Sequence, residues 1–184
     1  MYKNTEATLS ENAMKPNTVG RESSKFLHTH PIYPPNSETG FASGTLILSQ
    51  DGEIPVEFLS PGDRIISRDS GFVTLDHISR SHQPIRAVRF AAGSLGHTRP
   101  EQDLTLPENQ LVFVRDWRAQ SLFGVAQAIV PARDLIDGEF ICDLGVQPLM
   151  LHQLHFAQPH VIYAGGLEVA GISSEINTIL RSAA

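Results

Sequence analysis

The chain has 184 residues, a net charge of −6 and one cysteine, Cys142. This length allows one domain with a substantial core, while the acidic balance argues against a nucleic-acid or membrane-surface partner. A lone cysteine excludes an intrachain disulfide framework and a cysteine-based zinc site, and no apolar run reaches the roughly 20 residues that span a bilayer.

The composition of the sequence changes near residue 39. Residues 1–39 are polar and proline-containing and cannot bury enough surface to offset the entropy of ordering, so we expect a disordered tail there. This tail has no classical signal peptide pattern. We expect the folded domain to cover residues 40–169. The isoleucines and leucine of residues 170–184 recur at helical spacing, which predicts a short helix in that C-terminal extension.

Short apolar runs separated by turn signals fill the predicted domain. Their number and spacing are typical of an all-β fold. In chain order we expect strands at 45–48, 54–56, 64–67, 72–75, 85–90, 104–106, 111–114, 128–130, 140–142, 149–156 and 161–164.

Two distant segments share one pattern. Residues 55–65 and residues 131–141 both read P-x-x-x-L-x-x-G-[DE]-x-I, 76 positions apart. In each copy proline opens a turn, leucine anchors the core, glycine allows a positive φ and an acid leads into a strand. One long-period repeat in a small domain predicts two halves related by pseudo-symmetry.

The motifs of the chain resemble those of the Hint domain, the hedgehog/intein module, in its bacterial branch that stands apart from splicing inteins. The segments that carry the resemblance are GFASGT at 40–45, PVEFLSPGDRIISRD at 55–69, LVFVRDWRA at 111–119, VPARDL at 130–135 and VIYAGGL at 161–167. The resemblance implies a horseshoe of short strands with two pseudo-symmetric halves. The branch of the family implies a bacterial origin. The lack of an apolar span and of a classical signal peptide predicts a soluble protein, either cytoplasmic or non-classically exported, and leaves its compartment open.

The resemblance also implies a chemistry. Hint domains break the peptide bond before their first residue, using a Cys or Ser there as the nucleophile and a histidine that protonates the leaving amine. Here Gly40 stands at the nucleophile position and Gln110 at the histidine position. Ala157 and Pro159 stand where related domains carry Asp and His. Three losses at separate positions predict a scaffold without self-cleavage chemistry.

Other chemistry-bearing residues have simpler interpretations. We interpret His152, His155 and His160 as half-exposed strand histidines, because residues of different parity face opposite sides of a strand. Cys142 is expected to be a buried, inert thiol.

Two further interpretations concern Trp117 and a pair of acids. Trp117 is expected to be a core aromatic that fixes an extended loop at 119–128. Asp63 and Glu139 are expected to be turn acids that bind backbone amides.

The sequence thus favours a catalytically inactive Hint scaffold that acts as a binding or structural module for a peptide or protein partner. The alternative is an autoprocessing domain that cleaves the Thr39–Gly40 bond, and a third hypothesis is hydrolysis or metal binding through the histidines. No cofactor and no metal are expected, and the sequence leaves the oligomeric state open.

Overall fold

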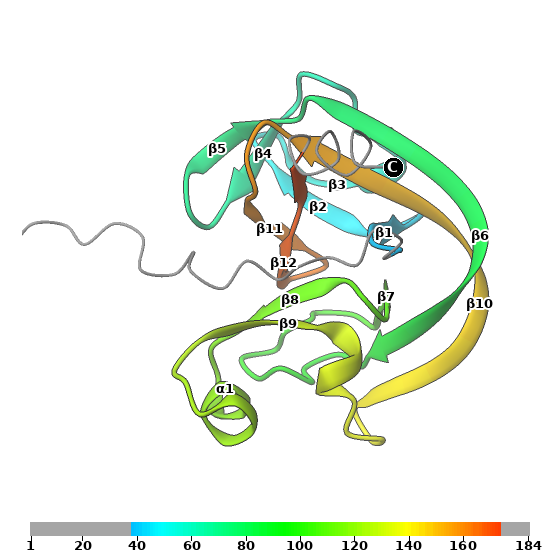
Figure 1. The fold of residues 1–184 in the computed structure, drawn as a ribbon. Coiled ribbons are helices and arrows are strands. Elements are labelled where there is room, and N and C mark those ends of the chain that lie inside the picture. The colour runs from blue at the N-terminus through cyan, green and yellow to red at the C-terminus, as the bar shows by residue number, and fades with distance from the viewer. Residues whose placement is uncertain (1–37, 174–184) are drawn as a thin grey trace, which may run out of the picture. The chain divides into compact units, whose positions relative to one another are not determined.

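The computed structural model describes residues 38–173, which form two mostly antiparallel sheets and one short α-helix (Figure 1). Residues 1–37 and 174–184 lie outside the described part, and with them almost all of the predicted tail and most of the predicted C-terminal helix. The predicted all-β class is confirmed for the described residues.

The first sheet has the strand order β1-β10-β6-β7, with β13 beside β10. Its strands are β1 (Phe41–Ala42), β6 (His77–Phe90), β7 (Leu104–Pro107), β10 (Ile141–Phe156) and β13 (Ile172–Ser173). The second sheet has the order β3-β2-β4-β11-β12-β8-β9, with β5 beside β4. Its strands are β2 (Leu46–Ser49), β3 (Gly52–Pro55), β4 (Arg64–Ser67), β5 (Gly71–Thr74), β8 (Leu111–Val114), β9 (Ala128–Pro131), β11 (Val161–Ala164) and β12 (Leu167–Ala170). The helical elements are η2 (Val56–Phe58), α1 (Trp117–Phe123) and η3 (Ala132–Leu135).

Two long strands, β6 and β10, form a curved antiparallel ribbon (Figure 1). Their length differs from the short strands that the sequence predicts at 85–90, 140–142 and 149–156. Pro84 and Pro148 lie opposite each other in the ladder. The two missing N–H groups therefore fall on one rung, and the strands continue through it.

The repeated sequence pattern marks two equivalent substructures. In each, a hairpin (β2–β3 or β8–β9) ends at a proline that begins a 3₁₀ turn, η2 or η3. The residue after that proline donates a backbone hydrogen bond to the residue before the hairpin, Val56 to Thr45 at 2.9 Å and Ala132 to Gln110 at 2.9 Å. The predicted pseudo-symmetry is confirmed at this level.

The anchors of the repeat behave as the pattern predicts. Leu59 and Leu135 are buried, and the glycines that follow them, Gly62 and Gly138, have φ of 99° and 81°. The acids differ between the copies. Asp63 accepts a hydrogen bond from the backbone N of Ser60, as expected.

In the second copy Glu139 does not take the expected role. Asp137 Oδ1 instead accepts from the backbone N–H groups of residues 139, 140 and 141. Because these amides hold the charged form, they lower the pKa of Asp137 against the opposing effect of burial, and Arg118 adds to the lowering. The prediction for Glu139 is wrong because the acid two residues earlier reaches the same amides.

The structure corrects two predictions, the start of the C-terminal helix and the environment of Trp117. Ala170 ends β12 and Ile172–Ser173 form β13, so the predicted helix does not begin at residue 170. Trp117 opens the helix α1, where an extended loop was expected, and its side chain is 67% exposed. The helix begins with an Asp116 cap and ends at Gly124 with φ of 71°, so both ends are fixed within seven residues.

Candidate functional site

The peptide bond between Thr39 and Gly40 lies buried where the chain enters the first sheet. Strand β1 follows it directly and pairs with β10, with Phe41 opposite His152. Thr39 is 4% exposed and Gly40 is buried. The bond that the resemblance identifies as scissile is therefore part of the interior.

Side-chain amides bind both polar groups of this bond. The carbonyl oxygen of Thr39 accepts a hydrogen bond from Gln153 Nε2 at 2.9 Å. The N–H of Gly40 donates to Gln110 Oε1 at 2.9 Å. Unpaired buried backbone groups are costly, so this arrangement stabilises the intact bond.

Each of the two carboxamides is also fixed at its other end. Gln110 Nε2 donates to the carbonyl oxygen of Ala170 at 2.8 Å, and Gln110 is only 2% exposed. Gln153 Oε1 accepts from Ser79 Oγ at 3.0 Å. Because a carboxamide has one donor side and one acceptor side, these partners set the orientation of both groups.

Position 40 has no space for a side chain. Gly40 has φ of 133°, and a Cβ there would lie 2.9 Å from the carbonyl oxygen of His152 and 3.1 Å from Gln153 Cγ. The first of these contacts is to backbone, which cannot rotate away. The structure therefore gives a steric reason for glycine at this position.

Of the four sequence-predicted site residues, the structure brings two together. Gly40 and Gln110 are hydrogen-bonded directly. Ala157 and Pro159 lie exposed in the turn between β10 and β11, and their side chains carry no polar atoms. Gln153 is the site residue that sequence reasoning missed, and only the register of β1 on β10 could have found it.

The nearby histidine His152 is buried, contrary to the half-exposed position predicted for it. It is 3% exposed, and burial lowers its pKa first, with a further decrease from Arg80 and an opposing effect of Glu57. His152 Nε2 lies 2.9 Å from Oγ of the exposed Ser43. His152 Nδ1 is buried without a hydrogen-bond partner among the described residues.

Within residues 38–173, this Ser43–His152 pair lacks the third group of a nucleophilic triad. A serine is activated when Nε2 accepts its proton while an acceptor holds the Nδ1–H. With no acceptor at Nδ1, that tautomer would bury an unpaired N–H, so the tautomer with the proton on Nε2 is favoured. The carboxylate of Glu57 accepts from the N–H of Gly44 at 2.7 Å instead.

The match with known sequences decides the family. Residues 39–173, well over half of the chain, match the Hint domain. The chain belongs to the Hint domain family.

One solved structure supports the fold of this Hint domain. The bacterial intein-like domain from Clostridium thermocellum has a TM-score of 0.52 and 16% identity, and the match covers 73% of this chain and 99% of that one. A DnaB intein from Synechocystis sp. PCC 6803 has a TM-score of 0.49 and 12% identity, covering 73% and 99%. The match to the Clostridium thermocellum domain shows only that the two chains share a fold. Comparison with curated proteins gives no match.

The remaining histidines and Cys142 form no metal site in the part of the chain that the structure describes. His155 is 6% exposed, so its predicted half-exposure is also wrong, and its Nε2 lies 2.8 Å from Ser79 Oγ. His160 Nδ1 lies 2.7 Å from Asp69 Oδ2. Cys142 is half-buried rather than buried.

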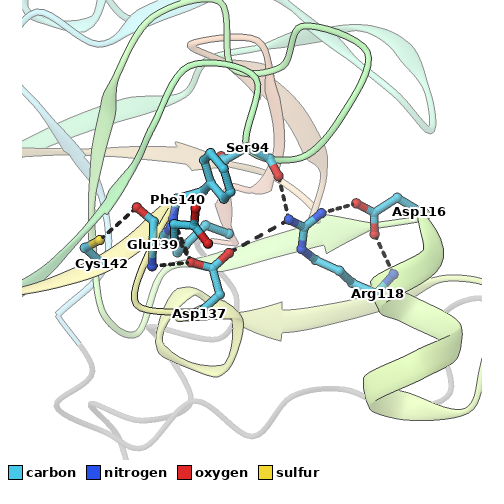
Figure 2. Close-up of polar contacts among 8 residues, drawn as sticks. Ser94, Asp116, Arg118, Asp137, Glu139, Phe140 and Cys142 are labelled. Carbon is cyan, nitrogen blue, oxygen red and sulfur yellow. Dashed lines mark hydrogen bonds and ion pairs between the residues drawn. The ribbon is translucent and has the colours of Figure 1, made fainter.

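The Hint domain carries a second polar cluster, around Arg118 in α1 (Figure 2). Arg118 donates to Asp116 Oδ2 at 2.7 Å and to the carbonyl oxygen of Ser94 at 2.7 Å, and its Nη2 lies 4.0 Å from Asp137 Oδ2. This side chain therefore connects α1 to the loop after β6 and to the turn before β10. A hollow of about 500 Å³ adjoins it, with exposed Trp117 and Phe140 in its lining.

No helix among residues 38–173 is long and apolar enough to cross a membrane.

Proposed function

We propose that this Hint domain is a non-catalytic scaffold that leaves the Thr39–Gly40 bond intact. The observation that carries the proposal is the double hydrogen bonding of that bond by Gln110 and Gln153, with no space for a side chain at Gly40. The domain would then act through binding, to a peptide or protein partner, or as a structural module.

Self-cleavage by this family's route needs a nucleophile and a proton donor at this bond. Gly40 has no side chain to attack the Thr39 carbonyl carbon. The amide nitrogen must receive a proton to leave, yet the atom of Gln110 that faces it is Oε1, an acceptor. The donor side of Gln110 is engaged by Ala170, so rotating the carboxamide would cost that bond as well.

Self-cleavage before Gly40 is the second candidate function, and one contact favours it. Gln153 Nε2 donates to the Thr39 carbonyl oxygen, which is where an oxyanion would develop during attack. The same donor also stabilises the intact amide. Without a nucleophile at Gly40, we regard the stabilising role as the operative one.

Intact mass spectrometry of the purified full-length chain separates the two functions. After several days at neutral pH, with and without dithiothreitol, we expect one species at the full-length mass. The thiol would capture any activated ester or thioester, so its addition makes the test sensitive. A fragment beginning at Gly40 would overturn the proposal.

A further inference from the structure

Three arginines converge on one buried carboxylate on the second sheet. Glu168 in β12 has a side chain that is 3% exposed. Arg68 Nη1 lies 3.3 Å from Glu168 Oε2, Arg115 Nη2 lies 3.0 Å from Oε1 and Arg99 Nη1 lies 3.5 Å from Oε1. Arg68 also stacks over the ring of Phe113, with 4.4 Å between its Cζ and the ring centroid.

The cluster has more positive than negative charge. Guanidinium groups stay protonated in proteins, so three of them facing one carboxylate leave two positive charges unmatched. Among residues 38–173, Glu168 is the one carboxylate within 4.0 Å of any of the three. The neighbouring acid Asp116 pairs with Arg118.

Other ion-paired arginines of the described part have a carboxylate of their own. Arg86 lies between Glu108 and Asp143, and Arg89 pairs with Asp103. The cluster around Glu168 therefore has an excess of positive charge, although the net charge of the chain is −6.

All three guanidinium side chains are partly accessible to a ligand, that of Arg68 being 28% exposed. The side chain of Arg115 is 45% exposed and that of Arg99 is 30% exposed. A guanidinium group has five N–H donors, and the single carboxylate of Glu168 cannot engage all the donors of both side chains. The backbone before Arg99 is also unusual, because His97 and Thr98 have φ of 51° and 59°. A β-branched residue such as Thr98 rarely adopts that conformation, so the backbone next to Arg99 is strained.

We propose that Arg68, Arg99 and Arg115 form a binding site for a doubly charged phosphate group. A phosphate dianion matches the two unmatched charges, and its oxygens accept paired hydrogen bonds from guanidinium forks. The recess lined by Arg99, Phe113, Arg115 and Glu168 has a volume of about 20 Å³, which holds about one water. The phosphate would therefore lie over the mouth of the recess, on the exposed faces of Arg99 and Arg115. This inference does not depend on whether the Thr39–Gly40 bond is cut.

Titration of the ¹⁵N-labelled full-length chain with inorganic phosphate and with O-phosphoserine tests the site by NMR. At pH 7.5 and constant ionic strength, we expect saturable shifts centred on the amides of Arg99, Arg115 and Glu168. Sodium chloride at matched ionic strength should produce none. Tighter binding of O-phosphoserine would indicate a phosphate ester as the ligand, and equal binding would indicate a free phosphate ion; both results support the site.

Matched variants distinguish a specific phosphate site from general screening of the protein's charges by the added ions. Arg115→Gln should weaken phosphate binding about tenfold, because it removes one charge-assisted contact. Arg86→Gln removes the same charge from a cluster that has two carboxylates and should leave the binding unchanged. Glu168→Gln removes the opposing charge and should tighten binding, and phosphate should raise the melting temperature of this variant more than that of the wild type. No saturable shift in the wild type, or equal weakening by Arg86→Gln and Arg115→Gln, would overturn the proposal.

Discussion

Replacing Gly40 with alanine is expected to destabilise the domain by about 2–5 kcal/mol, because strain and overpacking add together at this position. The φ of 133° is unfavourable for any residue with a Cβ, and the new atom would lie 2.9 Å from the carbonyl oxygen of His152. Urea unfolding followed by circular dichroism measures the change. The same steric argument applies to Gly40→Cys, so introducing a thiol at this position alone should not yield a folded domain that cleaves itself.

Gly44→Ala is the matched control for this prediction. Gly44 also has a positive φ, of 86°, but a Cβ there would meet nothing within 4 Å. Backbone strain alone costs roughly 1–2 kcal/mol, so Gly40→Ala should be clearly the more destabilising of the two. Equal losses would show that the space at Gly40 is not closed.

The second large effect is expected from Gln110→Glu, an almost isosteric change. One carboxylate oxygen could still accept the N–H of Gly40, but the other would face the carbonyl oxygen of Ala170, where Gln110 Nε2 now donates at 2.8 Å. A buried carboxylate opposed to a carbonyl costs several kcal/mol at neutral pH. The cost falls when the carboxyl is protonated and can donate.

The stability of Gln110→Glu should therefore depend on pH in a defined direction. Burial raises the pKa of the new carboxyl in the folded state, so the folded state binds more protons than the unfolded one. The variant should be nearest to the wild type below the unfolded pKa of about 4.3 and lose stability as pH rises through the raised folded pKa. Denaturation midpoints between pH 4 and pH 8 measure this.

Gln147→Glu provides the control for Gln110→Glu. Gln147 Nε2 also donates to a backbone carbonyl oxygen, that of Leu144 at 2.7 Å, but this bond lies at the surface. Water can solvate the new charge there, so we expect a change of less than about 1 kcal/mol. Similar pH profiles for the two variants would contradict the buried role of Gln110.

The repeated pattern carried most of what the sequence could predict about the fold. Proline, leucine and glycine each impose a local conformation, so η2, η3 and the strands beside them follow from the residues themselves. The length of β6 and β10 could not be predicted, because Pro84 and Pro148 look like breaks until their pairing is known. The length of these strands depends on the pairing register between distant segments, and a local sequence pattern does not contain that register.

Burial errors have a similar cause. Alternation along a strand predicts that one face is exposed, but Leu151, His152, Leu154 and His155 are all buried near the end of β10. Both faces of that strand end are covered, so His152 and His155 are interior. The prediction for Trp117 failed in the opposite direction. Trp117 was expected in the core, but in the seven-residue helix α1 the buried residue is Ala119.

The candidate site could be predicted only in part. The resemblance gave Gly40 and Gln110 as equivalents of family positions, but the hydrogen bond between them is a property of the folded chain. Gln153 carries no sequence signal, since its role comes from the pairing of β1 with β10 and from the bond with Ser79.

Hydrogen exchange at the amide of Gly40 tests the central claim most directly, namely that the Thr39–Gly40 bond is buried and bound on both sides. Gly44 offers an internal control, because its N–H also donates to a side chain, Glu57, but in an exposed contact. We predict that the Gly40 amide exchanges only when the domain unfolds globally, while the Gly44 amide exchanges much faster through local opening. A Gly40 amide that exchanges as fast as that of Gly44 would contradict the account.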